Sequence, residues 1–162
     1  MKPDKNLTID NTDKQILTML MLNGETPYAE IARKIFVSTG TVHVRMKKMK
    51  DAGLVSGTHL AINPEALGFD ITAFIGIFLE KSSMYHIIVQ QLKSIPEVTE
   101  CYYTTGNYSI FMKILCKDTS HLKNVLNDKI QGIEGINRTE TFISLEESIN
   151  RPMVLIDELS NK

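Results

Sequence analysis

A run of cationic and hydroxyl side chains between residues 31 and 50 has the chemistry needed to bind phosphate groups. Six cations and no acid occur in this run: Arg33, Lys34, Arg45, Lys47, Lys48 and Lys50. A local field of one sign attracts the phosphate backbone of a nucleic acid. Seven side chains are candidate DNA contacts: Ser38, Thr39, Thr41, His43, Arg45, Lys47 and Lys48. A solvated helix face is the competing explanation for each of them.

A second polar cluster has the chemistry to bind a small zwitterion. It comprises Thr104, Thr105, Gly106, Asn107, Tyr108 and Ser109. A glycine lets backbone approach a small ligand, and the hydroxyl and amide groups around it offer hydrogen-bond donors and acceptors. Turn chemistry alone would also place Gly-Asn at the tip of a hairpin. Secondary candidates, with exposed sheet polarity as the competing explanation, are Thr139, Glu140 and Thr141.

The chain lacks the motifs of common catalytic and metal sites, so we expect neither enzymatic activity nor a cofactor. It has no GxSxG, no phosphate-binding loop and no glycine-rich dinucleotide fingerprint. The histidines outside the basic run lack the spacing of metal ligands. Cys101 and Cys116 stand fifteen positions apart without a CxxC pattern, which predicts reduced and mostly buried thiols.

Three helices must position the basic run. Asp10 can cap a first helix with the apolar positions Ile16, Leu17, Leu20 and Met21, which Asn23-Gly24 ends. A short second helix follows Thr26-Pro27 and ends near Phe36. Ser38 can cap a third, basic helix that carries Val42, Met46 and Met49 on one side before Gly53. Two short helices joined by a tight turn are typical of a helix-turn-helix, whose last helix enters the DNA major groove.

The segment after the third helix predicts a wing and then a linker. Residues 54–62 are mostly compatible with β-structure and are interrupted by a glycine, which favours a strand or small hairpin. Asn63-Pro64 is typical of a turn, and we place a linker at residues 63–69.

The rest of the chain alternates strands and helices. We expect strands at 71–80, 98–104, 108–116 and 136–145, and helices at 84–93 and 122–130. This βαββαβ order is the ferredoxin-like split-βαβ arrangement. Its crossover helices cover one face of the sheet, so the half-bare opposite face predicts dimerisation.

Composition and charge support two domains within an α+β chain. The 162 residues are 43% hydrophobic and 23% charged, as in a folded globular protein. Residues 1–63 carry nine basic and six acidic side chains, a net +3, whereas residues 64–162 carry nine and thirteen, a net −4. We therefore expect a winged helix-turn-helix domain at 1–62, the linker, a ferredoxin-like ligand-sensing and oligomerisation domain at 70–147, and a tail at 148–162. The absence of a long apolar run and of a secretory signal favours the cytoplasm.

Three stretches, taken in order, resemble one protein family. They are IDNTDKQILTMLMLNGETPYAEIARKIFVSTGTVHVRMKKMKDAGLVSG, NPEALGFDITAFIGI and EVTECYYTTGNYSIFMKILC. Their co-occurrence is similar to the Lrp/AsnC, or feast/famine, family of prokaryotic regulators, and the similarity covers about 145 of the 162 residues. YYTTGNYS most resembles the asparagine-responsive branch, because many relatives, including leucine-responsive ones, have aspartate where this chain has Ser109.

The resemblance implies a function for both polar clusters. It implies a winged helix-turn-helix, a linking strand and a sensor domain that dimerises through its sheet, with dimers often assembling into an octameric disc. It also implies that a small amino acid, asparagine first, binds between dimers near residues 104–109. We therefore expect a sequence-specific, amino-acid-responsive regulator of transcription that binds double-stranded DNA and itself, and no membrane. An architectural DNA-wrapping protein with weak sequence preference is the alternative.

Overall fold

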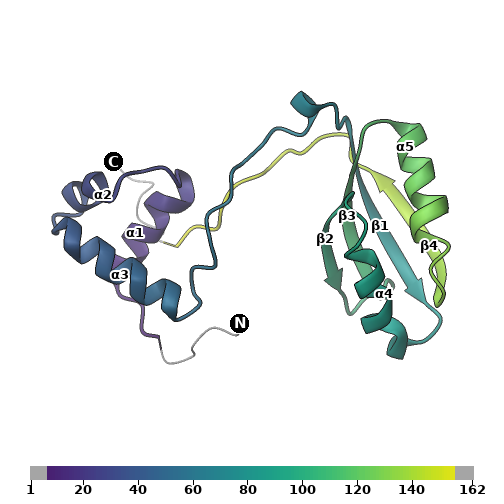
Figure 1. Cartoon of the computed structure of the whole chain (residues 1–162), viewed down its shortest axis with the longest axis horizontal. Helices are drawn as coiled ribbons and strands as arrows, with labels where there is room; N and C mark the ends of the chain where they lie inside the picture. Colours follow the sequence, from purple (N-terminus) through teal and green to yellow (C-terminus); the bar gives the residue numbers. More distant parts are fainter. Residues whose placement is uncertain (1–6, 156–162) are drawn as a thin grey trace. The chain divides into compact units, whose positions relative to one another are not determined.

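A computed structural model of the chain describes residues 7–155. These residues form two compact units, one of residues 7–61 with 149–155 and one of residues 62–148 (Figure 1). Each unit has a hydrophobic core of its own. No helix within residues 7–155 is both long enough and apolar enough to cross a membrane.

The first unit is built on three helices, as the sequence predicts. They are α1 (Asn11–Leu22), α2 (Tyr28–Lys34) and α3 (Thr39–Asp51). Their core consists of Ile16, Ile31, Ala32, Val42, Met46 and Met49. The predicted apolar side of the third helix is therefore confirmed, because its helical period brings these positions onto one face.

Both predicted caps form. The Asp10 carboxylate accepts a hydrogen bond from the Asp13 N–H at 2.9 Å, and Asp13 accepts one from the Asp10 N–H at 3.2 Å. This reciprocal pair satisfies two of the free amides at the start of α1. The Ser38 hydroxyl accepts a bond from the Thr41 N–H at 3.0 Å at the start of α3.

The strand or hairpin predicted at residues 54–62 is wrong. Residues 54–62 are all described, and none of them belongs to a strand. Most of these side chains are exposed, and a strand is stable only where its backbone groups find a neighbouring strand. A single 3₁₀ turn, η1 (Glu65–Leu67), follows in the predicted linker.

The second unit has the predicted βαββαβ order. Its strands are β1 (Ile71–Leu79), β2 (Val98–Tyr103), β3 (Ile110–Cys116) and β4 (Ile136–Ile143). They form one antiparallel sheet in the order β2-β3-β1-β4. The crossovers are η2 (Ser82–Met84) with α4 (Tyr85–Leu92), and α5 (Thr119–Asn124) continued by the π-helical turn η3 (Val125–Ile130).

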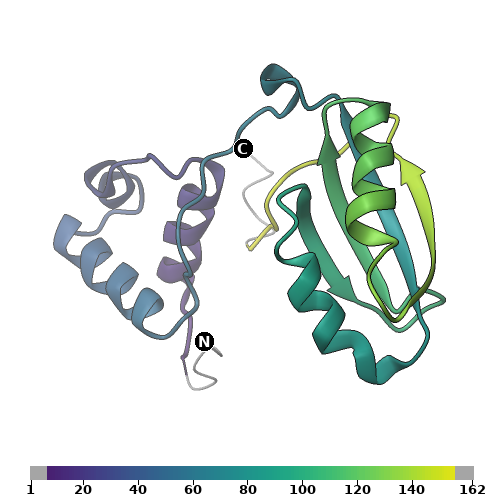
Figure 2. The same ribbon diagram turned by 45° about the vertical axis from the view of Figure 1, so that its right-hand side comes forward.

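The helices α4 and α5 lie on the same side of this sheet (Figure 2). Ile75, Ile77, Ile110, Met112 and Ile114 point to that side and are fully buried with Ile88 and Leu92 of α4 and Val125 of η3. The period-2 alternation of strands therefore sends the intervening residues of β1 and β3 to the opposite, helix-free face.

Aromatic side chains gather on the helix-free face. Phe74 of β1 stacks on Phe111 of β3 with ring centroids 5.9 Å apart, and Phe142 of β4 is 46% exposed. The Arg138 guanidinium lies 3.9 Å from the centre of the Phe78 ring. We call Phe74, Phe78, Tyr108, Phe111 and Phe142 the aromatic face.

Two further predictions are partly wrong or outside the structure. Cys116 is buried, but Cys101 is exposed because it lies on β2, an edge strand of the sheet. Burial raises the pKa of the Cys116 thiol, which keeps it protonated.

The tail predicted at 148–162 forms neither helix nor strand over residues 148–155, and residues 156–162 lie outside the described range.

Candidate nucleic-acid interface and effector loop

The outward side of α3 is set by its buried side. Because Val42, Met46 and Met49 face the core, residues about half a helical turn away face solvent. The exposed side chains include Thr39, His43, Val44, Lys47 and Lys48. Four of the seven candidate DNA contacts, Thr39, His43, Lys47 and Lys48, are therefore accessible to solvent on α3.

Two other candidates, Ser38 and Thr41, form hydrogen bonds within the first turn of α3. The Ser38 hydroxyl caps the helix and lies 2.8 Å from the Thr41 hydroxyl. Ser38 and Thr39 remain exposed, whereas Thr41 is half-buried. The free amides and the positive end of the helix dipole at this turn favour an anion such as phosphate.

Arg45 is turned toward α1 and away from the exposed surface. Its Nη1 lies 2.7 Å from Asp10 Oδ2 and 2.8 Å from Asp13 Oδ1, and its side chain is 29% exposed. Hydrogen bonds to Asp10 and Asp13 raise the pKa of Arg45. The positive charge of Arg45 is therefore already balanced within the unit.

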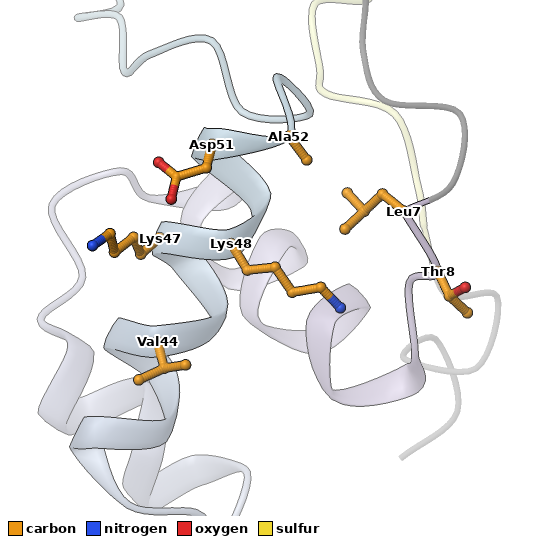
Figure 3. A pocket seen from close by; sticks show the side chains of 7 residues that line it. All are labelled: Leu7, Thr8, Val44, Lys47, Lys48, Asp51 and Ala52. Carbon is orange, nitrogen blue, oxygen red and sulfur yellow. The ribbon is translucent and has the colours of Figure 1, made fainter.

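The other two candidate cations of α3, Lys47 and Lys48, face solvent on two sides of the helix. In the described part of the chain, neither Lys47 nor Lys48 has a carboxylate within ion-pair distance. Lys48 points toward Thr8, and Lys47 points to the other side (Figure 3). The His43 ring packs edge-on against Tyr28 of α2 at 4.7 Å between centroids.

A shallow hollow lies between α3 and the segment that precedes α1. Two adjoining pockets of about 630 and 620 Å³ share Thr8, Val44 and Lys48 in their linings. Figure 3 shows Val44 and Lys48 on the rim of one pocket, opposite Leu7 and Thr8. The hollow extends the accessible surface beside the exposed side of α3.

In the second unit, Tyr108 fixes one end of the candidate effector loop. Its ring lies so close to Gly76 that a Cβ there would come within 2.4 Å of Tyr108 Cδ1. Its hydroxyl donates to Glu140 Oε2 at 2.6 Å, and this bond raises the pKa of Tyr108. The Ser109 N–H donates to the Ile77 carbonyl at 2.9 Å. The C-terminal end of the loop is therefore attached to β1 by these contacts.

The tip of the loop is open. Thr105, Gly106 and Asn107 are exposed, and a Cβ on Gly106 would meet no other atom within 4 Å. Gly106 is also absent from the glycines with positive φ among the described residues. Neither packing nor turn geometry therefore requires glycine at this position, which weakens the turn explanation for it.

The structure brings one secondary candidate, Glu140, together with Tyr108, but not the other two. Thr139 and Thr141 pair with Ile77 and Ile75, so they share the helix-covered side of the sheet. Tyr108 lies on the helix-free side, where Glu140 is its partner. The Thr139 hydroxyl instead accepts a hydrogen bond from Gln131 Nε2 at 3.0 Å.

Two residues of these sites were not among the sequence candidates. Val44 is 70% exposed on α3, and the helical period of its buried neighbours would have revealed this position. Gly76 supports the Tyr108 ring, but the two residues are 32 positions apart and no local pattern links them.

Family models match both units. Residues 9–56 match a winged helix-turn-helix DNA-binding model, and residues 72–154 match the Lrp/AsnC ligand binding domain. The three-helix unit and the four-stranded unit together therefore define a DNA-binding transcription regulator with a separate ligand-binding domain. The chain belongs to the Lrp/AsnC family.

Curated relatives and solved structures agree with this assignment. Regulatory protein AsnC of Escherichia coli K12 is 48% identical over 147 residues, covering 91% of this chain and 97% of the relative. HTH-type transcriptional regulator FL11 of Pyrococcus furiosus is 36% identical over 138 residues, covering 85% and 90%. The solved structure of E. coli AsnC has a TM-score of 0.86 at 46% identity, covering 91% of this chain and 99% of that chain.

A more distant structure shares the fold. A transcriptional regulator from Neisseria meningitidis, solved in complex with L-Met, has a TM-score of 0.85 at 23% identity, covering 89% of this chain and 94% of that chain. The α+β fold and the prediction of a regulator of transcription, not an enzyme, are confirmed by these matches.

Proposed function

We propose that this regulator binds specific DNA sequences through the outward side of α3 and responds to a small amino acid, with L-asparagine as the favoured effector. The observation that carries the DNA-binding proposal is the pair of solvent-facing ammonium groups, Lys47 and Lys48, on the last helix of a helix-turn-helix. Such a helix inserts into the major groove, where its cations displace counterions from the phosphates.

The α3 side chains divide into three roles. Ser38 and Thr39 stand at the helix start, where hydroxyl and amide groups hold phosphate. His43 is exposed and is proposed to reach base edges, and the half-buried Thr41 lies beside it. Lys47 and Lys48 contact phosphates. Arg45 positions α3 on α1 through Asp10 and Asp13, and we assign it no DNA contact.

The effector site is proposed at residues 104–109, with Gly106 and Asn107 at its open tip and Tyr108 at its fixed end. The L-Met complex of the Neisseria meningitidis regulator supports an amino acid as the class of effector. Asparagine is favoured because Ser109 leaves this loop without the acidic side chain that many relatives carry. Thr139 and Thr141 lie on the side of the sheet opposite Tyr108, so we keep them only as secondary effector contacts.

Self-association is proposed through the aromatic face of the sheet. Phe74, Phe78, Phe111 and Phe142 lie outside the helix-covered core, and burying them removes apolar surface from water. A dimer formed there is the unit from which the predicted octamer would assemble. We propose that the regulator acts in the cytoplasm, where its DNA lies.

Two linked measurements test this function. The full chain is used to enrich duplexes from a random pool, and its affinity for the enriched duplex and for a shuffled one is compared at the same salt concentration. We expect at least a thousand-fold preference, the lower end for specific regulators. A preference near one would instead support the architectural, DNA-wrapping alternative.

A thermal-shift screen of the twenty amino acids tests the effector. A ligand that binds only the folded state raises the melting temperature by an amount that increases with the ratio of its concentration to its dissociation constant. At equal concentrations we therefore expect L-asparagine to give the largest shift. Ser109→Asp is expected to reduce that shift, whereas Thr99→Ala, on the same unit but outside the loop, should leave it unchanged. No shift with any amino acid would exclude the effector proposal.

A further inference from the structure

We propose that Val44 contacts the 5-methyl group of a thymine in the major groove and so makes the regulator prefer thymine at one base pair of each half-site. This inference rests on the proposed DNA-binding role of α3. Val44 is 70% exposed although it is apolar, and it stands among polar side chains on the outward side of the helix.

The position of Val44 favours a role outside the chain. Its neighbours on the core side, Val42 and Met46, are 0% and 5% exposed, so the core is complete without Val44. Valine also has lower helix propensity than alanine, because its branched side chain loses rotamer freedom. Neither packing nor helix formation therefore explains valine at this position.

Gly40, one turn before Val44, provides a second observation. A Cβ on Gly40 would meet only the Ser38 hydroxyl oxygen, at an ordinary contact distance of 3.7 Å. Glycine weakens a helix relative to alanine, and nothing inside the unit requires it here. Residues 40 and 44 lie on the same side of α3, so the missing side chain lets an external surface approach Val44 closely.

The major groove offers one kind of apolar group to such a surface. Base edges there present hydrogen-bond donors and acceptors, and thymine adds its 5-methyl group. Lys47 and Lys48 flank Val44 and can hold the phosphates on the two sides of the helix. An exposed valine between phosphate-binding cations can therefore pack against a thymine methyl group.

The experiment removes the methyl group from the DNA. Each thymine of the enriched duplex is replaced in turn by deoxyuridine, and the dissociation constant of the full chain is measured by fluorescence anisotropy at fixed salt. At one thymine of each half-site we expect about four-fold weaker binding, which corresponds to burial of one methyl group. Val44→Ala should bind the thymine duplex more weakly and lose this sensitivity at that position only.

Control variants separate this contact from a general loss of binding. Val44→Ile keeps an apolar side chain and should keep the sensitivity to deoxyuridine. Leu22→Ala removes an apolar side chain that is 73% exposed on α1, and should leave the pattern unchanged.

Two results would overturn the inference: tight binding by the wild type that is unchanged by deoxyuridine at every position, or a Val44→Ala variant that keeps the full penalty. A chain that enriches no duplex at all would instead overturn the proposed function, and this inference with it.

Discussion

Arg45 on α3 lies 2.8 Å from Asp13 on α1, measured from Nη1 to Oδ1, and the Asp13 residue is only 4% exposed. The same Asp13 closes the capping box with Asp10 at the start of α1. One carboxylate therefore joins the first helix to the helix that we propose enters DNA. The orientation of α3 depends on this pair as well as on the hydrophobic core.

Removing Arg45 is expected to destabilise the first unit. Arg45→Ala leaves the buried Asp13 carboxylate without its cation, and an unpaired buried charge is costly. Because Arg45 is itself 29% exposed, we expect a loss of about 2 kcal/mol, below the full cost of a deeply buried pair. Thermal unfolding followed by circular dichroism, combined with a double-mutant cycle to Asp13→Ala, measures the coupling.

The exposed pair between Lys34 and Glu30 is a matched control. It joins nitrogen and oxygen at 2.9 Å within α2, but its side chains are 57% and 39% exposed. Lys34→Ala should therefore cost less than about 0.5 kcal/mol. Equal losses in the two variants would contradict the distinction between the pairs.

Acid should weaken the contribution of Asp10. Its pKa is lowered from the ordinary 3.8, first by the hydrogen bond from the Asp13 backbone and then by Arg45. A lowered folded-state pKa gives stability that is present above pH 3.8 and is lost as the pH falls through the folded value. Asp10→Asn keeps a capping side chain without the charge. The difference in melting temperature between the wild type and this variant should therefore shrink below pH 3.8; a constant difference down to pH 2 would rule out this linkage.

A side chain at position 76 should displace Tyr108. Gly76→Ala puts a Cβ within 2.4 Å of the Tyr108 ring, so the ring must move and its bond to Glu140 must weaken. We expect a loss of about 1–3 kcal/mol, as for overpacked cores, together with a weaker response to the effector. Gly57→Ala, where a Cβ meets nothing within 4 Å, is the control. Unchanged stability in Gly76→Ala would mean that Tyr108 does not rest on Gly76.

Phe36 carries strain that a glycine would relieve. It has φ of 57° in the turn before α3, and its side chain is 95% exposed. A left-handed conformation costs a non-glycine residue about 1–2 kcal/mol, and little burial is lost by removing this ring. Allowing for the greater freedom of glycine in the unfolded chain, Phe36→Gly should stabilise the protein by about 0.5–1 kcal/mol. The converse change, Gly53→Ala at φ 73°, should destabilise it. A lower melting temperature for Phe36→Gly would show that the ring makes a stabilising contact.

Local patterns predicted the elements well. Val42, Met46 and Met49 recur at helical spacing, and Asp10 and Ser38 are good caps, so α1 and α3 could be derived from neighbours in sequence. The alternation of strands and helices predicted the βαββαβ order in the same way. The order of strands in the sheet follows from the known geometry of that motif.

Predictions that depended on distant partners were weaker. Arg45 looks like any cation of a basic helix until Asp10 and Asp13, 35 and 32 positions away, are seen beside it. The strand expected at 54–62 has suitable residues, but strand formation needs a partner strand that a local pattern cannot supply. Strand alternation shows from the sequence that Thr139 and Thr141 share one face, but which face the helices cover depends on the packing of the whole unit.

The salt dependence of DNA affinity tests the central claim most directly. The affinity of the full chain for the enriched duplex is measured between 50 and 300 mM salt for the wild type, for Lys47→Ala/Lys48→Ala and for Lys123→Ala on α5. Each phosphate contact contributes about 0.9 to the slope of log K against log salt. We predict that the double variant lowers the slope by about 2 and that Lys123→Ala leaves it unchanged. An unchanged slope and affinity in the double variant would contradict DNA binding through the outward side of α3.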